Sequence, residues 1–123
     1  MVTITNTTDY ELSKLSFIIQ LSSMLIILFS LVIVSMSVKK GYIDRVSEIL
    51  KEIVNLMSEA DGCISVQLAQ DVINHDKFKI YEKWESEEKQ KEFLTLLREN
   101  GLFSQLIANL DDMPSSETYK TKN

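Results

Sequence analysis

Residues 59–68, EADGCISVQL, and residues 78–86, FKIYEKWES, decide the fold of this chain. The first stretch contains Gly62, which suits the positive φ with which many helices end. Apolar and polar residues then alternate, the pattern of a half-buried strand. The second stretch alternates in the same way, and Ser86 at its end can cap a following helix. The two stretches predict the end of one helix, a hairpin of two strands and the start of the next helix.

The segments on either side of the hairpin supply the rest of a small domain. Apolar residues recur at helical spacing over residues 43–57 and again over residues 93–97. The β-branched stretch at residues 31–38 predicts a first strand, and residues 116–121 predict a last strand after a short second helix. The order strand, helix, strand, strand, helix, strand predicts an α+β, ferredoxin-like antiparallel sheet with helices on one face. We expect this domain to span residues 31–123.

Bulk composition excludes several classes of function. A chain of 123 residues suits one domain with an added segment. Its net charge of −5 and its interspersed basic residues disfavour nucleic acid as a partner. One Cys and one His give neither a disulfide framework nor a metal cluster, and all three glycines fall at element boundaries, which excludes a Gly-rich phosphate loop. We expect no metal site and a reducing, cytoplasmic environment for the domain.

An apolar run precedes the domain. Residues 15–38 contain no charged residue, but if residues 31–38 form a strand, only residues 15–30 remain, and a membrane helix needs about 20 residues. Three interpretations of residues 1–30 stay open: a membrane anchor that overlaps the strand, an apolar helix that packs on the domain or a partner chain, and an upstream extension before a natural start at Met24. If the run spans a bilayer, Lys39, Lys40 and Arg45 place the domain in the cytoplasm.

The two deciding stretches resemble the antibiotic biosynthesis monooxygenase family. The likeness rests on Asp61-Gly62-Cys63 and on Tyr81-Glu82-Lys83-Trp84-Glu85-Ser86. The resemblance implies a dimeric α+β barrel, in which two sheets pack face to face as a homodimer. It also implies a small aromatic or quinol-like substrate, held between sheet and helices, that reacts with oxygen without metal or organic cofactor.

The strand at residues 78–84 carries the candidate chemistry. Alternation places Glu82 on one face with Phe78, Ile80 and Trp84, where desolvation would raise the pKa of its carboxyl toward the range useful for a base. Trp84 could wall a cavity and donate its indole N–H. A structural role for both, with Glu82 in a salt bridge and Trp84 in the core, is the competing interpretation.

The resemblance further assigns a substrate pocket to Val34, Ile80, Phe93 and Phe103. Many family members carry a His where this chain has Phe93, and related haem-degrading enzymes carry an Asn near Val34, which disfavours haem degradation here. We therefore expect a cofactor-independent monooxygenase, with a non-catalytic small-molecule binding or interaction module as the alternative.

Overall fold

The computed structural model describes Lys14 and residues 28–122. Residues 29–121 form one compact unit. The predicted apolar extension, residues 1–30, lies outside the described residues except for Lys14 and residues 28–30, so its three interpretations stay predictions. Within the described part of the chain, no helix has the length and apolar character needed to cross a membrane.

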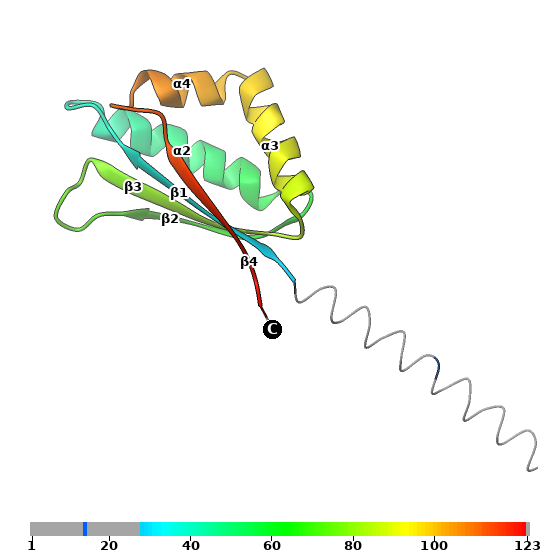
Figure 1. Cartoon of the computed structure of the whole chain (residues 1–123). Helices are drawn as coiled ribbons and strands as arrows, with labels where there is room; N and C mark the ends of the chain where they lie inside the picture. The colour runs from blue at the N-terminus through cyan, green and yellow to red at the C-terminus, as the bar shows by residue number, and fades with distance from the viewer. Residues whose placement is uncertain (1–13, 15–27, 123) are drawn as a thin grey trace, which may run out of the picture. The chain divides into compact units, whose positions relative to one another are not determined.

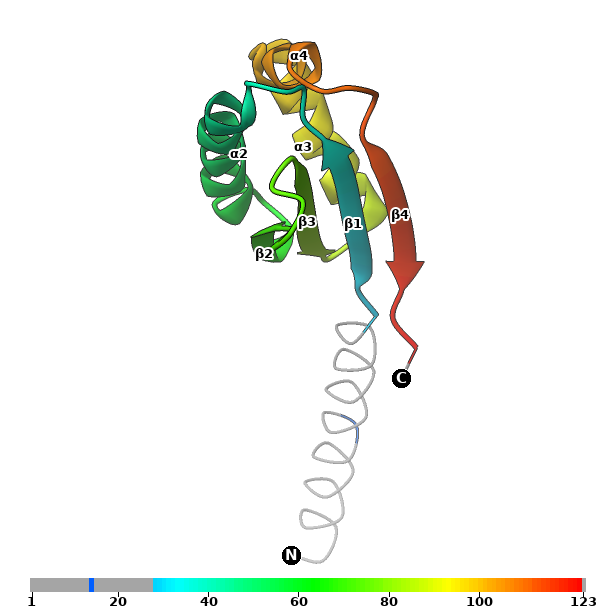
Figure 2. The ribbon, with the colours of Figure 1, turned by 90° about the vertical axis from the view of Figure 1, so that its left-hand side faces the viewer.

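A four-stranded antiparallel sheet forms the framework of the unit (Figure 1). Its strands, in the spatial order β2-β3-β1-β4, are β1 (Ser30–Ser37), β2 (Cys63–Gln70), β3 (Lys77–Trp84) and β4 (Ser115–Lys120). Figure 2 shows β4 beside β1 at one edge of the sheet. The helices are α2 (Ile43–Ser58), α3 (Glu87–Glu99) and α4 (Leu102–Ala108). The element order confirms the predicted ferredoxin-like α+β fold.

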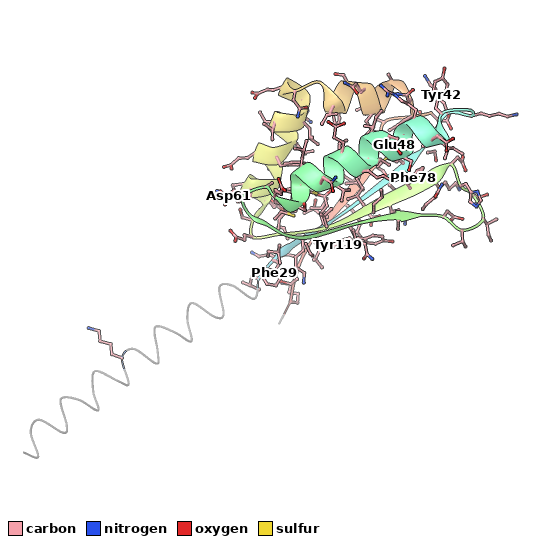
Figure 3. All side chains as sticks on the ribbon, turned by 180° about the vertical axis from the view of Figure 1, so that it is seen from behind. Phe29, Tyr42, Glu48, Asp61, Phe78 and Tyr119 are labelled. Atoms are coloured by element: carbon pink, nitrogen blue, oxygen red, sulfur yellow. The ribbon has the colours of Figure 1, made fainter. Side chains whose placement is uncertain are left out.

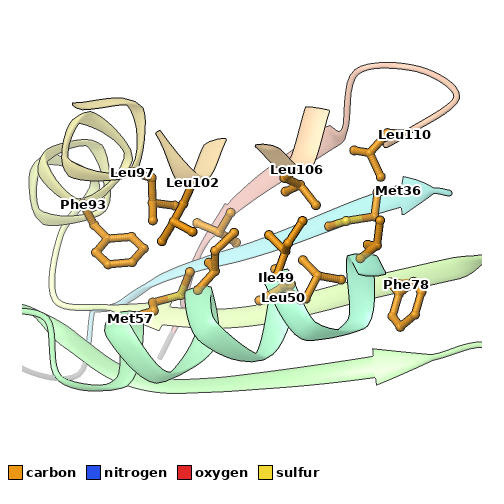
Figure 4. Packing of buried hydrophobic residues seen from close by; sticks show 14 of the residues in the cluster. Met36, Ile49, Leu50, Met57, Phe78, Phe93, Leu97, Leu102, Leu106 and Leu110 are labelled. Atoms are coloured by element: carbon orange, nitrogen blue, oxygen red, sulfur yellow. The ribbon is translucent and has the colours of Figure 1, made fainter. Parts of the chain in front are cut away.

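Helices α2, α3 and α4 cover the same side of the sheet, and the core lies between these helices and the sheet (Figures 1 and 4). Strand β3 shows how alternation directs side chains to this layer. Phe78, Ile80, Glu82 and Trp84 are buried, whereas the residues between them are exposed or half-buried. Helix α2 contributes a stripe of buried side chains at helical spacing: Val46, Ile49, Leu50, Ile53 and Met57.

Among the described residues no helix covers the other side of the sheet, which is called the open face below. On β3 it presents Lys77, Lys79, Tyr81 and Lys83, together with their cross-strand partners. The β4 residue Tyr119 projects to this side, away from the helices (Figure 3).

The two deciding stretches meet where α2 ends and α3 begins. Gly62 has a φ of 87°, and a Cβ added there would lie 2.5 Å from Cβ and Cγ of Lys89. The Lys89 stem thus crosses the glycine, and its Nζ reaches Oδ2 of Asp61 at 2.6 Å. The backbone N–H of Glu85 donates to the carbonyl of Gly62 (2.8 Å), and the Ser86 hydroxyl accepts from the backbone N–H of Lys89 (3.3 Å). These contacts fix the direction in which α3 leaves the hairpin, and so where it covers Trp84.

Candidate functional site around Glu82

A buried carboxylate lies in the middle of the sheet, on the side covered by the helices. Glu82 is 6% exposed, and its register partners are Val32 on β1 and Val66 on β2. Val32 is itself buried in the core, and Val66 packs against it. The carboxylate is therefore flanked by apolar side chains on both neighbouring strands.

Trp84 supplies the hydrogen bond that Glu82 makes. The indole Nε1–H donates to Oε1 of Glu82 at 2.8 Å, and Trp84 is fully buried. No ion pair joins Glu82 to any basic residue in the described part of the chain. The salt bridge that would have given Glu82 a purely structural role is thus not formed among these residues.

This environment perturbs the acidity of the Glu82 carboxyl. Burial raises its pKa from 4.5 to about 7, because the charged form loses its hydration. The indole hydrogen bond acts in the opposite direction, since it stabilises the carboxylate. A carboxyl group with a pKa near neutrality can accept and release a proton at ordinary pH.

An aromatic side chain from α3 packs against Trp84. The ring of Phe93 lies 5.7 Å from that of Trp84 between centroids, with the planes tilted by 40°. This tilted arrangement is among the favourable ones for aromatic pairs. Phe93 therefore occupies the space next to the indole.

The remaining predicted pocket residues pack in or against the core. Ile80 is buried and pairs with Val34 across β3 and β1, and Val34 is half-buried. Phe103 on α4 is half-buried beneath the Arg98 guanidinium, whose Cζ lies 5.3 Å from the ring centroid. The structure brings Glu82, Trp84 and Phe93 together, and it places Val34 beside Ile80.

Two hollows of about 540 and 480 Å³ lie elsewhere, on the open face. None of Val34, Ile80, Phe93 and Phe103 lines either one. Glu82 borders the smaller hollow, but most of that hollow's lining residues alternate to the open face: Leu31, Ile33, Ser65, Gln67, Tyr81 and Lys83. The assignment of a substrate pocket to the space between sheet and helices stays a prediction, because core side chains fill that space in this structure (Figure 4).

The larger hollow was missed in the sequence analysis. It collects Ser35 and Ser37 of β1, Lys77 and Lys79 of β3, and Ser115 of β4. The sequence does contain a sign of this polar surface, because polar residues occur at every second position. They do so in SMS at residues 35–37 and in KFK at residues 77–79. Only strand pairing shows that these separate segments form one surface.

Of the other reactive side chains, His75 lies at the far end of the hairpin from Glu82, whereas Cys63 on β2 is the register partner of Trp84. His75 lies in the β2–β3 turn, where its Nε2 is 3.3 Å from the carbonyl oxygen of Val72. Burial is the main cause that raises the pKa of the Cys63 thiol, which makes it a poorer nucleophile. Among the described residues, no three His, Cys, Asp or Glu side chains are grouped so as to hold a metal ion.

The chain is similar to one known protein family and to several solved structures. A family model described as antibiotic biosynthesis monooxygenase matches residues 30–100. None of the curated proteins is a significant match. Among solved structures, a conserved protein from Methanosarcina mazei Go1 is 19% identical over 81% of this chain and 99% of that one, with a TM-score of 0.73.

Two other solved structures carry the family description. A candidate antibiotic biosynthesis monooxygenase from Nitrosomonas europaea is 13% identical over 76% of this chain and 89% of its own, with a TM-score of 0.71. Another, from Chloroflexus aurantiacus J-10-fl, is 24% identical over 77% of this chain and 94% of its own, with a TM-score of 0.65. At these identities the likeness establishes the shared fold.

Proposed function

Because the chain belongs to the antibiotic biosynthesis monooxygenase family, we propose that it is a cofactor-independent monooxygenase that oxidises a small aromatic or quinol-like molecule. The observation that carries the proposal is the Glu82 carboxyl, which is buried, has no basic partner in the described part of the chain and has its pKa raised to about 7. Such a group is a base of suitable strength for a phenolic proton.

In the proposed reaction, Glu82 accepts the proton from a substrate hydroxyl, and a ring carbon of the phenolate donates electrons to molecular oxygen. The carbon–oxygen bond forms as a peroxide, and loss of water leaves a new carbonyl group. A hydroquinone plus oxygen gives a hydroxyquinone plus water, so the substrate supplies all the electrons. The Trp84 indole N–H keeps the Glu82 carboxylate in place during the transfer.

Substrate entry requires a movement of the side chains above the pair. Phe93 packs against Trp84 in a tilted arrangement, and Phe103 packs against the same core from α4. An aromatic substrate that replaces the Phe93 contact with Trp84 would preserve the aromatic packing while bringing a hydroxyl toward Glu82. We therefore assign the catalytic role to Glu82, the positioning role to Trp84, and the pocket wall to Val34, Ile80, Phe93 and Phe103.

Oxygen consumption by the purified protein, with a chelator present, tests this function. Against a panel of hydroquinones and anthrone-like aromatics, we expect uptake that falls by about 100- to 10,000-fold in Glu82→Gln, because the variant cannot accept the proton. Glu85→Gln is the matched control, since Glu85 is exposed and directly follows the same tryptophan in the sequence. Equal uptake by wild type and Glu82→Gln would refute the role of Glu82.

The alternative function is a non-catalytic small-molecule binding module. Two observations favour it: Phe93 stands in place of the family histidine, and the space between sheet and helices is filled. In this case none of the panel would be consumed, but an aromatic ligand would still quench or shift the fluorescence of Trp84, the single tryptophan of the chain.

We also propose that two copies associate through their open faces. The centre of this face carries half-buried Leu31 and Ile33, and beside them Tyr81 and Tyr119 are 42% and 50% exposed. Sedimentation at micromolar concentration is expected to give a dimer for the wild type and a monomer for Ile33→Glu. Leu96→Glu is the control, because Leu96 is an exposed leucine on α3. A wild-type monomer would contradict the proposal.

A further inference from the structure

Two polar side chains are buried in the described part of the chain, Ser30 at 7% exposed and Glu82 at 6% exposed. Ser30 on β1 is the register partner of Trp84. Val32, two positions further along β1, is the register partner of Glu82. Because Val32 belongs to the core and side chains alternate along a strand, Ser30 also faces the helices. The two buried polar groups are therefore diagonal neighbours on the same side of the sheet.

The carboxylate of Glu82 is directed toward the row of residues that contains Ser30. The indole Nε1–H of Trp84 donates to its Oε1 at 2.8 Å, so the carboxylate lies beside Trp84. Cys63 is in the same row on β2; burial is the main cause that raises the pKa of its thiol, and the Glu82 carboxylate adds to the effect. Trp84 is thus next to both buried polar groups, since register partners have their Cβ atoms about 4.5–5.5 Å apart.

Each of the two groups keeps an oxygen without a hydrogen bond in the described part of the chain. The indole bond uses Oε1 of Glu82 and leaves Oε2, and the Ser30 hydroxyl forms no hydrogen bond there. Among the same residues, no fully buried side-chain oxygen or nitrogen lacks a partner, so these two oxygens still touch solvent-accessible space. On its other side Ser30 pairs with β4, whose residues are all exposed (Figure 2). Buried polar groups are normally hydrogen-bonded, and a ligand that supplies the bonds would satisfy both oxygens.

We propose, on the basis of the function proposed above, that Ser30 binds the substrate of the Glu82 site and that this substrate carries two ring oxygens. One oxygen delivers its proton to Glu82, and the other forms a hydrogen bond with the Ser30 hydroxyl. A ring that replaces the contact of Phe93 with Trp84 lies against the indole, next to both groups. The site therefore prefers a dihydroxy aromatic over a monophenol of the same size.

A serine hydroxyl suits both the substrate and the product of such a reaction. It accepts a hydrogen bond from the second hydroxyl of a hydroquinone, and it donates one to the carbonyl that replaces this hydroxyl in the quinone. A carboxylate could only accept, and an ammonium group could only donate. Ser30 thus retains its contact while the ring is oxidised.

Binding measured in the absence of oxygen separates this role from turnover. Naphthohydroquinone and naphthol differ by one hydroxyl, and the indole N–H signal of Trp84, the single tryptophan, reports binding of either in NMR spectra of the full chain. We expect the wild type to bind naphthohydroquinone more tightly than naphthol. Ser30→Ala is expected to weaken binding of naphthohydroquinone about two- to tenfold, the effect of one hydrogen bond. Its affinity for naphthol is expected to be unchanged.

Two further variants control for the position and for the hydroxyl. Ser30→Thr keeps a hydroxyl on a residue that suits a strand, so it is expected to retain the preference for naphthohydroquinone. Ser35→Ala is the matched control, because Ser35 lies on the same strand but pairs with Lys79 on the open face. Urea unfolding detects a merely structural role. Because the Ser30 hydroxyl has no partner among the described residues, Ser30→Ala is not expected to lower the urea midpoint.

The outcomes distinguish this role of Ser30 from the proposed function. Equal weakening for the two ligands in Ser30→Ala, equal affinities in the wild type, or binding of neither ligand would overturn it. Oxygen uptake that depends on Glu82 would then still support the monooxygenase. Conversely, a preference that depends on Ser30, without any oxygen uptake, would support a ligand with two ring oxygens and contradict the monooxygenase.

Discussion

Replacement of Trp84 by alanine is expected to lower the free energy of unfolding by about 3–5 kcal/mol, the usual cost of deleting a large aromatic side chain from a core. Trp84 is fully buried and packs against Phe93. The variant also leaves the Glu82 carboxyl without its indole donor, and an unsatisfied buried polar group adds to the loss. Since the free energy of unfolding of a small domain is only about 5–15 kcal/mol, this single change would remove a large part of it.

Urea unfolding followed by far-ultraviolet circular dichroism measures this effect without relying on tryptophan fluorescence, which the variant lacks. Tyr42→Ala is the control, because Tyr42 is 48% exposed and lies outside both the core and the open face. It is expected to cost less than about 1 kcal/mol. Trp84→Phe retains most of the volume and isolates the loss of the N–H donor. A loss below about 1 kcal/mol in Trp84→Ala would mean that the core rearranges around the indole.

The stability of the wild-type domain is expected to fall as the pH rises through the range between the two pKa values of Glu82. The carboxyl has a pKa of 4.5 in its reference state and about 7 in the folded domain. Between these values the folded state retains a proton that the unfolded state has released, so stability decreases with increasing pH. Its contribution is fully present below pH 4.5 and is lost above pH 7. The separation of the two pKa values corresponds to about 3 kcal/mol.

Glu82→Gln isolates this contribution from those of other carboxyl groups. Asp71, for example, has a lowered pKa and so acts in the opposite direction, since its stabilising contribution is lost as the pH falls. The difference in unfolding free energy between variant and wild type removes such shared contributions. We expect the unfolding free energy of the variant, relative to that of the wild type, to rise by about 3 kcal/mol as the pH increases from 4.5 past 7. A difference that is constant with pH would show that Glu82 titrates normally in the folded domain.

These two experiments bear on the proposed function. A glutamine at residue 82 could still accept the indole hydrogen bond without the cost of burying a charge. A glutamate there therefore lowers stability at neutral pH, and groups with such a cost are often found at functional sites. If Glu82→Gln is both more stable than the wild type above pH 7 and inactive in oxygen uptake, the residue that lowers stability is also the residue that accepts the proton.

The sequence by itself determined the order of the elements, the face of each strand and the turn at Gly62. These features follow from local patterns, such as the helical spacing in residues 43–57 and the period-two alternation in residues 78–84. Burial of the apolar side of each element then decides which side faces the core. Alternation alone also placed Glu82 with Phe78, Ile80 and Trp84, and desolvation at such a position predicted the direction of its pKa shift.

Only the tertiary structure decided which groups meet. The hydrogen bond from Trp84 to Glu82 depends on side-chain conformations in the packed core, and the Phe93 contact depends on the angle at which α3 leaves Ser86. The filled space between sheet and helices follows from the summed volumes of side chains on six separate elements, β1, α2, β2, β3, α3 and α4. The hollow with Lys77 and Lys79 likewise requires β1, β3 and β4 to pair in one register. Local periodicity depends only on neighbouring residues, whereas long-range contacts arise from packing among segments far apart in the chain.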